Sequence, residues 1–365
     1  MFDGTFKRIS AKRISALKSI MEKSEFDCYV CRLPPNIQYL LANSRVSGEG
    51  FALMIFLDDK LPLLYIPKLE ETRIKFEVKN VNIKLLNHGK FEENLLKSFL
   101  EKKVKNVCFD SLSLTELQLF KKRLKNTAFK LSPNILINLR ETKDRFEVKL
   151  IEKATQISAI GVKAGLEFLR AGIKEIEVAA EIEYEVRKRG AEGLAFKTIV
   201  ASGFRSSFPH ADSTEKKIKS GDPVIIDVGA KFMGYTSNIT RTGYVGSPSK
   251  IYQKIYNIVV SAQSKAIKAI KPGLKGFEAD SIARKVIIDE GYGEYFIHGL
   301  GHGLGLEVHE PPRLSATSED TLKNMQVITV EPGIYLPYKF GVRIEDVCLV
   351  TSQGLKVISK KYIQS

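Results

Sequence analysis

The sequence has no apolar segment long enough to cross a membrane. Its longest apolar run, FALMIFL at 51–57, is short, whereas a transmembrane helix needs about 20 apolar residues. The first ten residues, MFDGTFKRIS, are charged and lack the apolar core of a secretion signal. These absences argue against an integral membrane protein, and we expect a cytoplasmic location.

Cysteine is also scarce, with four among 365 residues, which fits a reducing compartment. Cys28 and Cys31 form a CxxC pair inside FDCYVCRLP, a segment with the composition of a buried strand. Side chains three apart in a strand point to opposite faces, so we expect neither a disulfide nor a shared metal there. Both cysteines are predicted to act as small apolar core residues.

Acidic residues are outnumbered by basic ones, 42 against 57, which gives a net charge of +15. Residues 1–140 contain 25 basic and 15 acidic side chains, and the remaining 225 residues contain 32 and 27. The excess is dispersed, and no basic motif interleaved with aromatic residues accompanies it, as nucleic-acid recognition would favour. The charge therefore indicates a solvated basic surface that modestly attracts acidic partners. We do not expect nucleic acid to be one of them.

The length allows two domains, each with its own core. Helical patterns at 12–24, 91–103 and 115–126 alternate with strand patterns at 26–33 and 50–67, which predicts an α/β N-terminal domain. Residues 131–144 contain Pro133 and turn polar, so we expect a linker there. The predicted domains are 1–131 and 132–365, and an amphipathic helix begins the second near Phe146.

The second domain contains a faint internal repeat. AGIKEIEVAAEIEYEVRKRG (171–190) aligns without gaps with PGLKGFEADSIARKVIIDEG (272–291), at an offset of 101 residues. Gly190 then matches Gly291, and glycine is suited to helix C-termini. The repeat predicts two similar halves with a cleft between them, although two unrelated amphipathic helices would produce a similar match.

Histidine is rare as well, yet three of the five histidines lie in HGLGHGLGLEVHE, residues 298–310. Its alternating glycines argue against a helix, because each interior glycine costs about 1 kcal/mol relative to alanine. In an extended backbone His298 and His302 share a face, whereas His309 needs a twist or bulge to join them. The bare face lets another backbone or a ligand approach closely, and clustered histidines with acids favour a metal or catalytic site.

A hairpin supplies one acidic residue for such a site. PVIIDVGAKFMGYTSNITRTGYV (223–245) is predicted to turn at Met233-Gly234, so that the numbers of opposing residues add to 467. Asp227 and Asn238 then share a face and lie diagonally close.

Two further apolar strand patterns contain glutamates. VITVEPGIYL contains Glu331, and GVRIEDVCLV contains Glu345, with Arg343 two residues earlier on the same face. A carboxylate inside an apolar strand must be paired or must bind a metal. Each acid alone could be paired with an arginine, but together with His302 they favour a metal site.

Four segments, in chain order, resemble the motifs of the pita-bread metallopeptidases, and within that family the Xaa-Pro dipeptidase (prolidase) and aminopeptidase P type. They are ASGFRSSFPHA, VIIDVGAKFMGYTSNITRT, HGLGHGLGLEVHEPPRLS and VITVEPGIYLPYKFGVRIED. The resemblance covers residues 140–360, and PPNIQYLL fits the family's smaller N-terminal domain. It implies an α/β domain of creatinase/prolidase type, an α+β pita-bread catalytic domain, a homodimer, and a dipeptide or peptide substrate with proline after the cleaved bond.

The resemblance also implies roles. The family's metal positions fall on Asp227, Asn238, His302, Glu331 and Glu345. The positions that bind substrate, stabilise the reaction's intermediate or flank the metal fall on His210, His298, His309 and Arg343. Carboxylates with one imidazole suit manganese or cobalt, with zinc as an alternative, in a two-metal site. Glu331 would shuttle a proton, and His309 and His210 would donate to the oxyanion. Only His88 is left as an ordinary surface residue.

Asn238 departs from the family pattern, which has an acidic, metal-bridging residue there. An amide oxygen is neutral and a weaker donor, so we expect one tightly held metal at most and impaired hydrolysis. The alternative is a pseudoenzyme of the same fold that binds a peptide or a partner, but the other four metal positions and the three accessory histidines favour a peptidase. A metal-free hydrolase of creatinase type is disfavoured, because it would need further metal ligands to be replaced and they are not. Methionine aminopeptidase is disfavoured because it lacks this kind of N-terminal domain.

Overall fold

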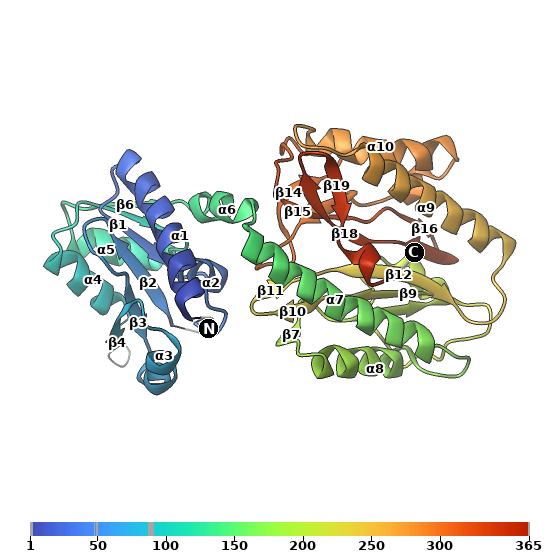
Figure 1. The fold of residues 1–365 in the computed structure, drawn as a ribbon, viewed down its shortest axis with the longest axis horizontal. Helices are drawn as coiled ribbons and strands as arrows, with labels where there is room; N and C mark the ends of the chain where they lie inside the picture. Colours follow the sequence, from blue (N-terminus) through green and yellow to red (C-terminus); the bar gives the residue numbers. More distant parts are fainter. Residues whose placement is uncertain (1–2, 47, 49, 87–90, 364–365) are drawn as a thin grey trace. The chain divides into compact units, whose positions relative to one another are not determined.

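The computed structural model (Figure 1) describes residues 3–46, 48, 50–86 and 91–363. His88 lies outside these residues. The chain divides into two compact units, 1–140 and 141–365. The predicted linker 131–144 is largely helical, because it contains α6 (Asn134–Glu141). Pro133 directly precedes this helix and does not break it, since proline is tolerated where a helix starts.

The first unit is built on a mixed six-stranded sheet with the order β4-β3-β2-β1-β5-β6. The strands are β1 (Cys28–Cys31), β2 (Ala52–Phe56), β3 (Leu63–Ile66), β4 (Asn82–Leu85), β5 (Asn106–Phe109) and β6 (Ala128–Leu131). The helices are α1 (Asp3–Lys23), α2 (Pro34–Leu41), α3 (Glu71–Glu77), α4 (Phe91–Glu101) and α5 (Leu114–Arg123). The α/β prediction is confirmed, and β2 and β3, both within the strand pattern at 50–67, form an antiparallel pair.

The cysteines of the CxxC pair are core residues, as predicted. Cys28 and Cys31 are free and buried in β1. Burial raises the pKa of both thiols well above its usual value, which keeps them protonated. The pair therefore has the properties of packing residues and not of a redox site.

The second unit begins with the long helix α7 (Arg145–Phe168), whose N-cap Asp144 and Glu147 form a capping box. Its other helices are α8 (Glu175–Lys188), α9 (Lys250–Ala269) and α10 (Gly276–Asp289). None of the helices in the described part of the chain is both long and apolar enough to span a bilayer.

The strands of the second unit fall into two groups. The first comprises β7 (Gly193–Leu194), β8 (Ile199–Ser202), β9 (Pro223–Val228), β10 (Ala230–Phe232), β11 (Tyr235–Thr236) and β12 (Ile239–Tyr244). The second comprises β13 (Gly301–Gly303), β14 (Glu310–Leu314), β15 (Val327–Val330), β16 (Gly333–Leu336), β17 (Phe340–Arg343), β18 (Asp346–Thr351) and β19 (Gly354–Val357). The central sheets have the orders β12-β9-β8 and β14-β13-β15-β18-β19. In Figure 1, α8 and α10 lie on opposite sides of these strands.

The internal repeat is confirmed in the structure. Helices α8 and α10 begin 101 residues apart, at Glu175 and Gly276. Each has a lysine N-cap with a capping-box glutamate, and each is followed by a glycine with positive φ, 94° and 83°. The equivalent pairs are Lys174 and Lys275, Glu177 and Glu278, and Gly190 and Gly291. The two halves of this unit therefore share local geometry as well as sequence.

The predicted hairpin register is also confirmed. Asp227 lies opposite Thr240 in the β9–β12 pair, and Lys231 lies opposite Thr236 in the β10–β11 pair. The turn residues Met233 and Gly234 both have positive φ, 46° and 81°, as the tightest hairpin turns require. Because Asp227 and Thr240 are directly opposed in this register, their side chains project from the same face of the sheet.

Candidate metal centre and active site

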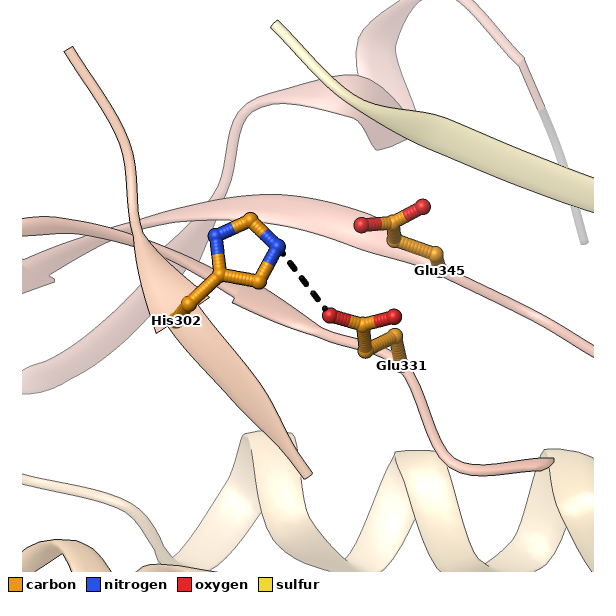
Figure 2. A group of neighbouring side chains, drawn as sticks. All are labelled: His302, Glu331 and Glu345. Carbon is orange, nitrogen blue, oxygen red and sulfur yellow. Dashed lines mark ion pairs between the residues drawn. The ribbon is translucent and has the colours of Figure 1, made fainter. Parts of the chain in front are cut away.

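Three side chains from separate segments converge in the second unit. His302 lies on β13, Glu331 directly follows β15, and Glu345 lies between β17 and β18. One potential ligand atom from each lies within 4.8 Å of the other two (Figure 2). His302 Nε2 is 3.2 Å from Glu331 Oε1. Two carboxylates and an imidazole at such distances form a candidate site for a divalent ion.

The glycine-rich strand allows this convergence. A Cβ atom on Gly301 would lie 2.1 Å from the carbonyl oxygen of Thr329, so only glycine fits between the strands. The β13–β14 pairing shifts register between His302 and Gly303, within the segment where a twist or bulge was expected. As a result, the ring centroids of His302 and His309 are 4.3 Å apart.

Several oxygens around this cluster have nothing to accept from. Among the described residues, Asp227 Oδ1, Asn238 Oδ1 and Glu345 Oε1 are buried without a hydrogen-bond partner. The other oxygens of the two acids are held, Asp227 Oδ2 by Arg343 NH2 at 2.7 Å and Glu345 Oε2 by Thr240 Oγ1 at 2.7 Å. Buried acceptors are normally satisfied, so these anchored side chains with free oxygens fit a cation.

The electrostatics of the metal-free site agree with this donor set. Burial raises the pKa of Asp227 and of Glu345, and repulsion from Glu331 raises both further. Burial acts in the same direction on Glu331, but the hydrogen bond and charge of His302 outweigh it and lower the Glu331 pKa to about 2. The crowded carboxylates therefore favour added positive charge, whether protons or a metal ion.

A second cluster, made of His298, Tyr335 and Arg343, is joined to the first through Asp227. Arg343 NH1 donates to Tyr335 Oη at 2.8 Å, and the same hydroxyl lies 2.9 Å from His298 Nε2. Burial lowers the pKa of His298, which favours its neutral form. Tyr335 thus joins His298 to the arginine that pairs with Asp227, although its place in an apolar strand pattern gave no functional signal in the sequence.

His210 and His309 lie at the outer part of the site. His309 is exposed at the surface of the site, and its pKa is lowered by partial desolvation and then by the neighbouring His302 and His210. His210 is exposed, on the loop that follows the short helix η2 (Gly203–Ser207). His302, His309 and His210 are close enough to affect the pKa of His309, so they lie in one region of the site. His309 and His210 are the more exposed of the three.

Comparison with known proteins decides the family. Residues 149–352 match the model of Metallopeptidase family M24, and residues 13–142 match the Creatinase/Prolidase N-terminal domain. The chain belongs to metallopeptidase family M24. This membership confirms the expected combination of a creatinase-type N-terminal domain and a pita-bread catalytic domain.

M24 relatives match along nearly the whole chain. The Xaa-Pro dipeptidase of Pyrococcus furiosus is 41% identical over 351 residues, which cover 96% of this chain and 98% of the relative. The solved prolidase from Pyrococcus horikoshii OT3 aligns with a TM-score of 0.88 and 40% identity, over 96% of this chain and 98% of that one. The solved X-Pro aminopeptidase from Thermotoga maritima MSB8 aligns with a TM-score of 0.87 and 33% identity, over 95% and 97%.

Further residues of this M24 site were not among the sequence candidates. Thr329 Oγ1 donates to Glu331 Oε1 at 3.1 Å and accepts from the backbone N–H of His302 at 3.1 Å. Thr240 holds Glu345, as described above. The alternation of Thr329 with Glu331, and the register that pairs Thr240 with Asp227, are signals that could have identified both threonines.

Gln263 hydrogen-bonds the backbone next to Glu331 and Glu345. It is buried in α9, and its Nε2 donates to the carbonyl oxygens of Val330 at 3.1 Å and Ile344 at 3.2 Å. These two residues directly precede Glu331 and Glu345. One side chain therefore links the backbone positions that carry two of the candidate ligands. Its only sequence signal is a polar residue on the apolar face of a helix.

Proposed function

We propose that this chain hydrolyses the peptide bond between an N-terminal residue and proline in a metal-dependent reaction, as a Xaa-Pro dipeptidase or an aminopeptidase P. The observation that carries the proposal is the set of anchored carboxylates with unpartnered oxygens around His302 and Glu331. Relatives named for Xaa-Pro dipeptidase activity that match over nearly the full length support the substrate class.

The residues proposed to hold the metal are Asp227, Asn238, His302, Glu331 and Glu345. Their oxygen-rich donor set suits manganese or cobalt, with zinc as an alternative. A divalent ion at this position supplies Lewis acidity toward a peptide carbonyl and toward water. We propose no more than one tightly held ion, because Asn238 offers a neutral amide in place of a carboxylate.

The remaining residues act on the substrate and on the proton. Glu331 accepts the proton of the attacking water and passes it to the leaving amine, since its carboxylate lies within the cluster proposed to hold the metal. His309 and His210 donate to the oxygen that becomes negative in the transition state. His298 and Arg343, joined through Tyr335, bind and orient the peptide beside Asp227.

A pseudoenzyme that only binds peptides is the competing function, and Asn238 is the one residue that favours it. The experiment that separates the two is metal analysis of the purified protein together with hydrolysis of a Xaa-Pro dipeptide and of a longer Xaa-Pro peptide. A metal-loaded protein that cleaves neither substrate contradicts the proposed activity. Faster cleavage of the dipeptide identifies a dipeptidase, and faster cleavage of the longer peptide an aminopeptidase.

We also propose a homodimer and a cytoplasmic location. Light scattering at micromolar concentration should give twice the 40.9 kDa mass of the chain. A monomeric mass contradicts the homodimer.

A further inference from the structure

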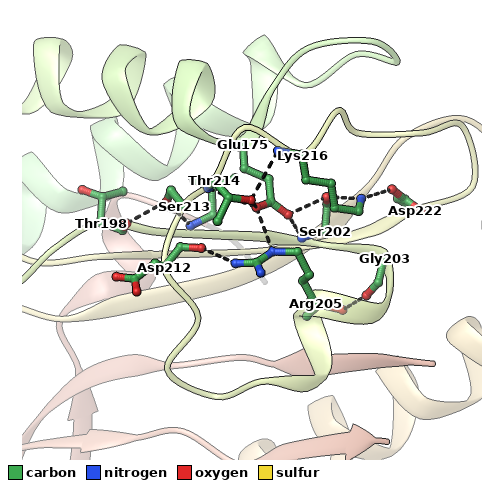
Figure 3. A network of polar contacts seen from close by, with 12 residues as sticks. Glu175, Thr198, Ser202, Gly203, Arg205, Asp212, Ser213, Thr214, Lys216 and Asp222 are labelled. Carbon is green, nitrogen blue, oxygen red and sulfur yellow. Dashed lines mark hydrogen bonds and ion pairs between the residues drawn. The ribbon is translucent and has the colours of Figure 1, made fainter. Parts of the chain in front are cut away.

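We propose that Glu175 is a positioning residue that holds the His210-bearing loop, residues 203–213, in its working position. Glu175 is the first residue of α8, and its side chain is fully buried. Its carboxylate accepts five hydrogen bonds (Figure 3). The donors are Ser202 N and Oγ, both at 2.8 Å, Arg205 Nε at 3.1 Å, Thr214 N at 3.2 Å and Thr214 Oγ1 at 2.7 Å.

This carboxylate links the two ends of the loop at its base, beside Ser213, whose Oγ accepts from Val200 N and donates to the carbonyl oxygen of Thr198, both at 2.9 Å. Ser202 is the last residue of β8 and Thr214 follows the loop, so Glu175 binds the residues on both sides of it. Arg205 extends the contact inward, because its NH2 donates to the carbonyl oxygen of Asp212 at 2.5 Å. Charge-assisted hydrogen bonds of this kind are stronger than neutral ones.

The second half of the domain closes the equivalent loop differently. There, residues 304–309 carry His309 and are flanked by β13 and β14, which pair with each other. In the first half, β8 pairs with β9 alone among the described strands, so no ladder joins the two ends of the loop. The five hydrogen bonds to Glu175, together with the two of Ser213, take the place of that ladder.

The glycine at the equivalent helix position supports this contrast. Gly276 corresponds to Glu175 in the repeat, and a Cβ atom on Gly276 would lie 2.1 Å from the carbonyl oxygen of Arg313. The second half therefore has no room for a side chain at this position. The carboxylate clamp belongs to the first half, where a loop without strand pairing needs it.

The other side of the loop is attached to the active site. Arg343 NH1 donates to the carbonyl oxygen of Pro209 at 3.1 Å, and Gly341 N donates to Ser206 Oγ at 2.9 Å. His210 itself is exposed, so the loop's backbone anchors set its position more than side-chain packing does. Glu175 does not reach the substrate region directly, and it acts through His210. The inference rests on the proposed function in this respect.

The first test measures the loop itself. In Glu175→Gln the side-chain volume is kept, but the amide turns a donor toward the hydroxyl, amide and guanidinium donors around it. The control is Glu177→Gln on the same helix, where the carboxylate accepts from Lys174 N at 2.8 Å. Amide hydrogen exchange across 203–214 should accelerate by about tenfold or more in Glu175→Gln alone. Equal exchange in the two variants overturns the proposal.

The second test measures the coupling to His210, with manganese titration calorimetry alongside it. Glu175→Gln should bind manganese like the unmodified protein, and its kcat on a Xaa-Pro dipeptide should fall by about tenfold. In a His210→Ala background, Glu175→Gln should cause no further loss, because both changes remove the same contribution. Multiplying effects overturn the proposal, since Glu175 would then act through the fold. A fully active His210→Ala protein also overturns it but leaves the peptidase proposal standing. If no Xaa-Pro substrate is cleaved by the unmodified protein, the proposed function fails, and the exchange experiment alone decides the clamp.

Discussion

Arg343 and Asp227 form a buried ion pair, with Arg343 NH2 2.7 Å from Asp227 Oδ2 and side chains that are 4% and 9% exposed. The pair fixes one carboxylate oxygen and leaves the other, Asp227 Oδ1, without a partner among the described residues. The arginine also offsets part of the negative charge that two divalent ions would otherwise meet. Each remaining ligand charge therefore has a larger effect on metal affinity. The residue at position 238 then determines whether a second ion binds.

Asn238→Asp should restore binding of two metal ions and raise turnover by at least about tenfold, equivalent to ~1.4 kcal/mol in the barrier. The change adds one negative charge and a second anionic oxygen at the buried position of Asn238 Oδ1. Manganese titration calorimetry on both proteins, with a Xaa-Pro dipeptide assay, measures the effect. Two ions of equal affinity and equal turnover in the Asn238 protein would mean that the amide is a competent ligand.

His302→Ala should abolish metal-dependent activity, because it removes the only imidazole of the candidate metal set. His309→Ala should keep the metal content and lower turnover by roughly 10²–10³-fold, the effect of one lost oxyanion donor. The two rings are 4.3 Å apart, so each variant is a matched control for the other. Loss of metal in His309→Ala would show that the two roles are wrongly divided.

Gln263→Met should weaken manganese binding and destabilise the protein by about 1–3 kcal/mol, the cost of buried carbonyls that lose their donor. The carbonyls concerned belong to Val330 and Ile344. Calorimetry gives the affinity and chemical denaturation gives the stability. Gln253→Met, at an exposed position of the same helix, is the control and should change neither. Unaltered manganese affinity in Gln263→Met would limit the role of Gln263 to folding.

Lys143→Met should destabilise the protein by about 3–5 kcal/mol, because it removes the positive charge beside the buried carboxylate of Glu310. Lys143 Nζ lies 3.2 Å from Glu310 Oε2, and the side chains are 1% and 4% exposed. Glu310→Gln in the same chain should recover part of the loss by removing the negative charge as well. Denaturation of the single and double variants measures this, and additive losses would contradict a direct pair.

The features that could be predicted from the sequence are those set by spacing within one pair of neighbouring strands. The hairpin register followed from a two-residue turn at Met233-Gly234 and a side-chain period of two, so the pairing of Asp227 with Thr240 followed too. The odd spacing from His302 to His309 indicated a twist or bulge, and the structure has a register shift after His302 and then a loop, residues 304–309, that leads into β14. Both inferences needed only residues within one strand pair.

Other features depend on contacts that no local pattern encodes. Helix α6 occupies the predicted linker because Pro133 marks a helix start as readily as a helix end. Gln263 contacts residues 67 and 81 positions away, and Glu175 closes a loop whose end lies 39 positions away. Tyr335 occupies an apolar strand pattern, and only the fold brings its hydroxyl between His298 and Arg343.

The unequal closure of the two histidine loops has a consequence for how this protein can change. A strand ladder is made of peptide groups, so the loop that carries His309 is held by the backbones of β13 and β14, although Gly301 and Gly303 must remain glycine for the strands to fit. The loop that carries His210 is attached mainly through side chains: Glu175 and Ser213 hold its ends, and Ser206 Oγ and the carbonyl oxygen of Pro209 hold its middle. Only its exposed positions outside these contacts, such as Phe208, are therefore open to replacement. New preferences for the residue before proline should arise most readily at such exposed positions, without any change to His210 or to the metal ligands.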